Sequence, residues 1–185
     1  MSFADPREEL IQHLPAMRAF AISLTRNSAV ADDMVQDTVV KAWTNIDKFE
    51  LGTNMRAWLF TILRNTYYSN RRKTKREVSD TDGTITGGVA EKPAHDGHMQ
   101  LADFRRALAQ LNDEQREALL LVGASGFSYE EAAEMCGVAV GTIKSRTNRA
   151  RKELAKLLGY DNDDKLELTD DATMSVLSSS HTSSF

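Results

Sequence analysis

Apolar residues recur at three- and four-residue spacing through two long stretches of the chain, and this periodicity predicts amphipathic helices. In the first stretch we expect helices over about 6–26, 29–47 and 54–76, with Asn27 and Ser28 as candidate caps of the second helix. Three such helices can close one small core. The predicted core positions are Leu10, Leu14, Met17, Ala21, Leu24, Val35, Thr38, Val39, Ala42, Ile46, Met55, Trp58, Leu59, Ile62 and Thr66.

Helical periodicity resumes at about residue 100. Asn112 followed by Gln115, and Ser128 followed by Glu131, are both typical of a capping box at the start of a helix. Gly137 is expected to end the helix that Ser128 opens.

The predicted architecture is all-α, with two small helical domains at 1–76 and 100–159. Residues 77–99 contain glycines and one proline without helical periodicity, so we expect a flexible linker there. Residues 160–185 form a tail that is acidic and then rich in serine, and this composition is typical of disorder.

The net charge of −4 is not spread evenly along the chain. Residues 1–76 hold 12 Lys and Arg against 8 Asp and Glu, whereas residues 77–99 hold 1 against 5 and residues 160–185 hold 1 against 6. The acidity therefore lies in the linker and the tail. The helical parts are neutral to basic, which is compatible with nucleic-acid binding.

Composition also narrows the class of protein. No apolar run approaches membrane-spanning length and the N-terminus has no secretory pattern, so we expect a cytoplasmic protein without a membrane partner. The single cysteine, Cys136, excludes an intrachain disulfide and disfavours a thiolate zinc site. The histidines are scattered and form no catalytic set. We therefore expect no enzyme activity, no metal, no cofactor and no small-molecule substrate.

The strongest functional signal is a helix-turn-helix pattern at residues 128–157, in which a short capped helix and a glycine turn precede a longer basic helix at about 140–158. On a helical wheel centred on Ile143, an apolar stripe lies opposite a polar, basic face. Such a face suits DNA, because cations bind phosphates and short polar side chains reach base edges. The candidate DNA-contacting residues are Thr142, Lys144, Ser145, Asn148 and Arg149.

A simpler interpretation of the same pattern is a solvated basic face on an ordinary pair of helices. Arg146 and Arg151 flank the apolar stripe, where they could serve packing or ion pairs instead of DNA.

Residues 64–76 hold six cations and no acid, interleaved with aromatic side chains. The wheel places Phe60, Arg64, Tyr67 and Arg71 opposite the predicted core stripe, with Tyr68 beside them. Cations among exposed aromatic rings suit single-stranded DNA, since phosphates meet the cations and bases stack on the rings. The alternative is that these rings cover a domain edge or pack on the linker.

The helix at 29–47 directs Asp33, Gln36, Asp37 and Val40 outward together. A charged outer face is usually only solvated. Trp43 lies at the edge of the predicted stripe and is expected to be half exposed.

Three blocks of sequence resemble the extracytoplasmic-function group of the sigma-70 family: DDMVQDTVVKAW, NMRAWLFTILRNT and SYEEAAEMCGVAVGTIKSRTNRARKEL. Their order and spacing match across about residues 6–158. AWLFTILRN together with QREALLLVGASGFSYEEAAEMCG is similar to the general-stress-response subgroup of alphaproteobacteria. Ala139 departs from the family pattern, in which Ser or Pro often precedes the recognition helix.

The resemblance implies a subunit that binds core RNA polymerase and directs it to promoter DNA. Asp33, Gln36, Asp37 and Val40 match positions that dock on the clamp helices of the largest polymerase subunit. The resemblance further implies a small anti-sigma partner. Two sets of residues match positions that read promoter DNA. The −35 set is Thr142, Lys144, Ser145, Asn148 and Arg149. The −10 set is Phe60, Arg64, Asn65, Tyr67, Tyr68, Arg71, Arg72 and Lys73, and Asn65 matches the position that holds a flipped-out base.

Two rival functions belong to other classes. A sigma-like decoy that sequesters the anti-sigma factor would need a receiver domain of about one hundred residues or more, and it would not need the DNA-facing cations. A two-domain repressor that uses only the helix-turn-helix would leave the basic aromatic segment unexplained.

Overall fold

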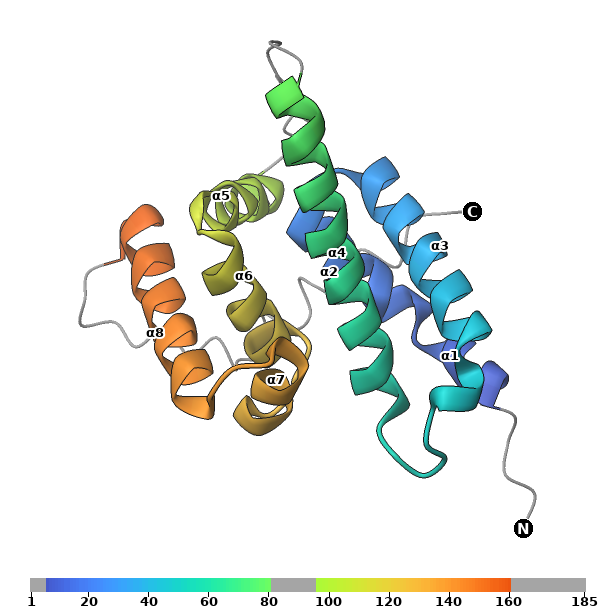
Figure 1. Cartoon of the computed structure of the whole chain (residues 1–185). Coiled ribbons are helices and arrows are strands. Elements are labelled where there is room, and N and C mark those ends of the chain that lie inside the picture. The colour runs from blue at the N-terminus through green and yellow to red at the C-terminus, as the bar shows by residue number, and fades with distance from the viewer. Residues whose placement is uncertain (1–5, 81–95, 161–185) are drawn as a thin grey trace. The chain divides into compact units, whose positions relative to one another are not determined.

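A computed structural model describes residues 6–80 and 96–160 of the chain, with side chains described over 6–77 and 101–160. The chain divides into two compact units, one within Met1–Glu91 and the other within Lys92–Phe185 (Figure 1). Every regular element in the described ranges is a helix or a helical turn. The predicted all-α class is therefore confirmed.

In the described part of unit 1 there are four α-helices and one helical turn, and the longest of them, α4, packs against the other three α-helices (Figure 1). Their bounds are α1 (Pro6–Gln12), α2 (Leu14–Thr25), α3 (Ser28–Thr44), the 3-10 turn η1 (Ile46–Lys48) and α4 (Met55–Asp80).

Side-chain caps mark the starts of α3 and α4. Asn27 caps α3 by accepting a hydrogen bond from the Val30 N–H at 3.1 Å, as the sequence predicts. Asn54 accepts from the Ala57 N–H at 3.0 Å and starts α4 in the same way. The single helix predicted over 6–26 is wrong, because Pro15 lies in the first turn of α2 and lacks the N–H that would continue α1.

The buried face of α4 is wider than the predicted stripe, because three helices cover it. The buried residues of α4 are Met55, Leu59, Phe60, Leu63, Thr66 and Tyr67. The Phe60 ring lies 5.1 Å from the Phe20 ring of α2, centroid to centroid. Trp58, predicted as core, is only half-buried, and its ring lies 5.3 Å from that of Phe49.

The segment 77–99, predicted to be non-helical throughout, is helical at both ends, since α4 continues to Asp80 and α5 begins at Asp96. Residues 81–95 and the predicted tail from residue 161 lie outside the described residues.

Unit 2 is built from short helices, with α6 and α7 both packed on the long α8 (Figure 1). Their bounds are α5 (Asp96–Gln110), α6 (Asp113–Leu119), the π-helical turn η2 (Leu120–Ala124), α7 (Tyr129–Cys136) and α8 (Val140–Leu157). Ser128 and Glu131 form the predicted capping box. Gly137 adopts the left-handed conformation at φ 65° and ends α7, which confirms the predicted turn. In the described ranges, no helix combines the length and the apolar composition needed to cross a bilayer.

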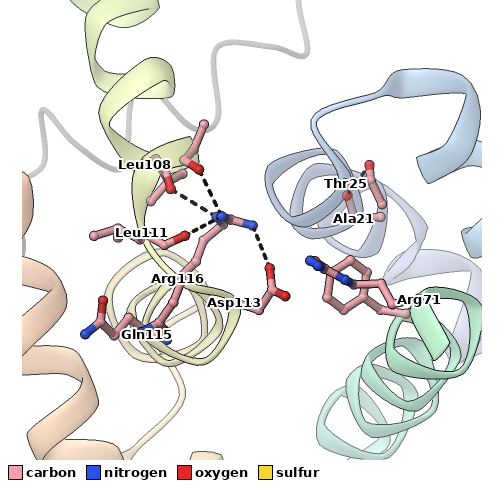
Figure 2. Close-up of polar contacts among 11 residues, drawn as sticks. Ala21, Thr25, Arg71, Leu108, Leu111, Asp113, Gln115 and Arg116 are labelled. Carbon is pink, nitrogen blue, oxygen red and sulfur yellow. Dashed lines mark hydrogen bonds and ion pairs between the residues drawn. The ribbon is translucent and has the colours of Figure 1, made fainter. Parts of the chain in front are cut away.

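The buried guanidinium of Arg116 ties the end of α5 to α6 (Figure 2). It donates hydrogen bonds to three carbonyl oxygens at and just after the C-terminal end of α5: Leu108 at 3.0 Å, Ala109 at 3.1 Å and Leu111 at 2.5 Å. It also forms an ion pair with Asp113 at 3.3 Å. A buried cation satisfied by this many acceptors is costly to replace, because its loss strands buried carbonyl groups.

Arg116→Lys is expected to lower the free energy of unfolding of unit 2 by about 2–3 kcal/mol, because lysine cannot reach all three carbonyls at once. Urea denaturation of the full chain, followed by far-UV circular dichroism, measures this change. Both tryptophans, Trp43 and Trp58, lie in unit 1, so the tryptophan fluorescence transition should stay in place. Arg106→Lys, which alters an exposed pair with Asp103, is the control. Equal effects of the two variants would contradict the role given to Arg116.

Candidate nucleic-acid and protein interfaces

The outer face of α3 carries two carboxylates, an amide and an apolar side chain on adjacent turns. Asp33, Gln36, Asp37 and Val40 are all exposed, as predicted, and Val40 is 63% exposed. Trp43 continues this face and is 49% exposed. We call these five residues the α3 face. Val40 and Trp43 give this otherwise polar face an exposed apolar area.

Two polar contacts fix α3 on its neighbours. Arg18 of α2 donates to Asp32 at 2.6 Å and 3.3 Å, and this hydrogen bond together with the carboxylate charge raises the pKa of Arg18. The ammonium group of Lys41 donates to the hydroxyl oxygen of Thr66 on α4 at 2.9 Å. The α3 face and the basic surface of α4 are therefore held on one framework within unit 1.

The prediction that Phe60 and Tyr67 lie on the outer side of α4 is wrong. Phe60 is 0% exposed and Tyr67 is 5% exposed, so neither ring is available for stacking on a base. The cause is the three-sided packing of α4, which extends the core beyond the stripe that a single helical wheel suggests.

The remaining residues of the predicted −10 set stay at the surface. Arg71, Arg72 and Lys73 are exposed, and so is Asn65. Arg64 and Tyr68 are half-buried. The exposed part of the basic segment therefore presents one amide, one partly exposed ring and a run of cations.

Cation–π contacts order the rings of this segment. The Arg64 guanidinium lies 4.8 Å from the centre of the Tyr68 ring. The rings of Tyr67 and Tyr68 meet edge to face, with centroids 5.2 Å apart. Arg71 donates to the Tyr67 hydroxyl at 3.0 Å. Tyr67 therefore supports Tyr68 and Arg71 from beneath, and Tyr68 is the ring that remains accessible.

The helix-turn-helix keeps its predicted polar face. Ile143, Thr147, Ala150 and Leu154 are fully buried. The opposite face exposes Lys144, Asn148 and Arg149, with Thr142 and Ser145 half-buried beside them. All five predicted DNA-contacting residues of α8 therefore lie on its outer side. Ala139 caps α8 without a side-chain hydrogen bond, as its methyl group requires.

Arg146 forms an ion pair with Glu114 of α6 at 2.8 Å, which places it in packing and not on the DNA-facing side. This bears out the structural role considered for it. The pair links α6 to α8.

The helical wheels missed two residues that shape these surfaces. Arg7 of α1 places its guanidinium 5.0 Å from the Trp43 ring at the end of the α3 face. Tyr129 of α7 lies with its ring 5.6 Å from the ammonium group of Lys144. No local pattern could have found the first contact, because its partners are far apart in the sequence. The second follows only from the fold of the helix-turn-helix.

Comparison with known proteins gives the same division of the chain. Residues 10–77 match the sigma-70 region 2 family and residues 101–154 match the sigma-70 region 4 family. The ECF RNA polymerase sigma factor EcfG of Rhodopseudomonas palustris is 54% identical over 155 residues, covering 84% of this chain and 86% of the relative.

Two solved structures are also similar. The sigma factor RpoE of Bartonella quintana, in complex with the anti-sigma factor NepR, is 56% identical with a TM-score of 0.76, covering 83% of this chain and 96% of that one. CnrH, in complex with the cytosolic domain of CnrY, is 29% identical with a TM-score of 0.60, covering 83% of this chain and 87% of that one.

Phe60→Ala is expected to destabilise unit 1 by about 3–5 kcal/mol, because a large ring is removed from a closed core. Tryptophan fluorescence during urea denaturation of the full chain reports this loss. Arg72→Ala removes an exposed side chain of the same helix and should change the stability by less than about 0.5 kcal/mol. If the Phe60→Ala protein were as stable as the original, the burial of this ring in the core would be contradicted.

Proposed function

Because the chain belongs to the extracytoplasmic-function group of the sigma-70 family, we propose that it acts as an alternative sigma factor of the general stress response. It binds core RNA polymerase and directs initiation at promoters with −35 and −10 elements. Polymerisation itself is the work of the core enzyme, so this chain needs no catalytic site. It acts in the cytoplasm, where RNA polymerase is found.

The observation that carries this proposal is that both candidate DNA helices keep cations on their exposed sides. Lys144 and Arg149 lie on the surface of α8, and Arg72 and Lys73 lie on the surface of α4. A protein that served only to sequester another protein would have no need of both sets. A repressor with one DNA-binding helix would have no need of the basic surface of α4.

We assign promoter reading to the two domains separately. Residues 100–159 read the −35 element through Thr142, Lys144, Ser145, Asn148 and Arg149. In helix-turn-helix proteins the first turns of the recognition helix enter the major groove, and this is where these residues lie. Each domain takes its own promoter element.

Residues 1–76 open the −10 element. Asn65 and Tyr68 receive the unpaired bases, while Arg64, Arg71, Arg72 and Lys73 bind phosphates. A base taken out of the stack loses a few kcal/mol of pairing and stacking, which contacts to the protein offset. Phe60 and Tyr67 act from the core by holding α4 and its surface side chains in place.

The α3 face docks on the clamp helices of the largest polymerase subunit. Its carboxylates favour a basic partner, and Val40 and Trp43 supply apolar area at its end. A relative has been solved in complex with the anti-sigma factor NepR, and we propose that a small anti-sigma factor controls this chain too. Such a partner inhibits by covering the α3 face and part of residues 100–159 together, since two linked contacts bind more tightly than either alone.

Arg149→Ala is expected to weaken binding of the full chain to a −35 duplex by about 1–3 kcal/mol, or roughly five- to 150-fold. Fluorescence anisotropy at one stated salt concentration measures this, because phosphate contacts make the raw affinity salt-dependent. The preference over a scrambled duplex should fall as well. Arg105→Ala removes an exposed cation from α5 and should leave that preference unchanged. If both variants kept the same preference for the −35 duplex, Arg149 would contribute only its charge and would not contact a base.

A transcription assay with core polymerase and a stress-response promoter tests the whole proposal. The unmodified chain should give a specific transcript, and an anti-sigma factor of the NepR type should suppress it. Asn65→Ala combined with Tyr68→Ala should fail on duplex DNA and recover on a template opened in advance, because the unpairing cost is then already met. Val40→Asp, a docking variant, should fail on both templates.

Asn70→Ala, an exposed amide on the same helix as Asn65, is the matched control and should be active on both templates. Circular dichroism of each variant separates a folding defect from a functional one. If the unmodified chain gave no transcript with core polymerase, the proposed function would be wrong. If the Asn65 and Tyr68 variant failed equally on both templates while folded, the melting role would be wrong.

A further inference from the structure

A groove of about 790 Å³ lies in unit 2 along the C-terminal half of α8. Arg149, Lys152 and Lys156 line one side of it, and the start of α6 lines the other through Asn112 and Gln115. The groove ends at Gly159 and Tyr160, and Tyr160 is 52% exposed. Its walls are therefore polar and carry three cations.

The acids near this groove leave its positive charge largely unopposed. Asp113 is paired with Arg116 at 3.3 Å, and Glu114 is paired with Arg146 at 2.8 Å. Glu153 is the acid that lines the groove itself. Among the described residues, Arg149, Lys152 and Lys156 have no ion-pair partner. With three cations and one acid in its lining, the groove carries a net positive charge.

The position of the groove on α8 distinguishes it from the surface that reads bases. The first turns of a recognition helix enter the major groove of DNA, whereas Lys152 and Lys156 lie two and three turns further along α8. Arg149 belongs to both surfaces. An acidic ligand in the groove would therefore occupy a residue to which we assign a −35 contact.

The chain itself supplies such a ligand. Residues 161–171, DNDDKLELTDD, follow directly on Tyr160 and hold six carboxylates and one lysine. Because the segment is tethered at the mouth of the groove, its local concentration there is on the order of millimolar. A free acidic peptide or another protein would have to bind without this advantage.

We propose that residues 161–171 bind this groove and compete with DNA phosphates for Arg149. The acidic segment acts as an internal substitute for DNA, which lowers the affinity of the free chain for promoter-like and random DNA alike. The proposal rests on the proposed function in that −35 DNA is the competitor. Attraction of this kind weakens with salt, since exposed charges are screened within about 8–10 Å at physiological ionic strength.

The first test compares DNA affinity with and without the segment. Anisotropy of a labelled −35 duplex is measured for the full chain and for a chain ended after Tyr160. A third protein carries Asn in place of Asp161, Asp163, Asp164, Asp170 and Asp171 and Gln in place of Glu167. Both altered proteins should bind about three- to tenfold more tightly at low salt, because the closed state no longer reduces the competent fraction. A chain lacking only residues 172–185 is the control and should show no gain.

The Lys152→Ala and Lys156→Ala double variant separates groove binding from general repulsion. In this background the groove keeps only one of its three cations, Arg149, so ending the chain after Tyr160 should give a much smaller gain. If the gain persisted in full, the acidic segment would act only through long-range repulsion of DNA, and the proposal would be overturned. If the double variant lost DNA affinity while removal of the tail changed nothing, the groove would hold DNA backbone instead.

A second measurement needs no DNA. The backbone amide signals of Arg149, Lys152 and Lys156 in nuclear magnetic resonance spectra should shift between the full chain and the chain ended after Tyr160, and the shift should fade with added salt. Unchanged signals would overturn the proposal. If neither chain bound the −35 duplex, the proposed function would fail and this comparison alone would decide whether the tail occupies the groove.

Discussion

The packing of α4 beneath α1, α2 and α3 fixes which side chains of unit 1 meet solvent, and its candidate surfaces depend on this. α4 is both the centre of the core and the carrier of the basic segment. Phe60, Leu63 and Tyr67 are drawn into the core, which leaves Asn65, Arg72 and Lys73 on the outside. The same helix packing therefore decides both the core of unit 1 and the make-up of its basic surface.

The α3 face depends on the same packing. α3 lies against α2 and α4, and the contacts from Arg18 to Asp32 and from Lys41 to Thr66 hold it there. The exposed pair of Arg18 and Asp32 contributes little to stability, about 0–1 kcal/mol. The value of both contacts is geometric, because they hold the α3 face and the basic surface of α4 together within one unit.

The stability of unit 2 depends on polar contacts at helix ends. Its short helices α6 and α7 bury little surface and leave many free backbone groups at their ends. Arg116 satisfies the carbonyl groups at the end of α5, and the Ser128 capping box satisfies N–H groups at the start of α7. Arg146 and Glu114 then link α6 to α8. These polar contacts join the helices of unit 2 while Lys144, Asn148 and Arg149 on the outer face of α8 stay exposed.

The sequence by itself determined the features that depend on neighbouring residues. The cap at Asn27, the capping box at Ser128 and the turn at Gly137 need only local chemistry, and the face of α8 follows from periodicity because its partners cover one side. Tertiary structure alone decided the burial of Phe60 and Tyr67, because a wheel cannot show that three helices surround α4. It also decided the contact of Arg7 with Trp43 and the groove that joins Gln115 to Arg149. These depend on distances between residues far apart in the chain, and only packing sets such distances.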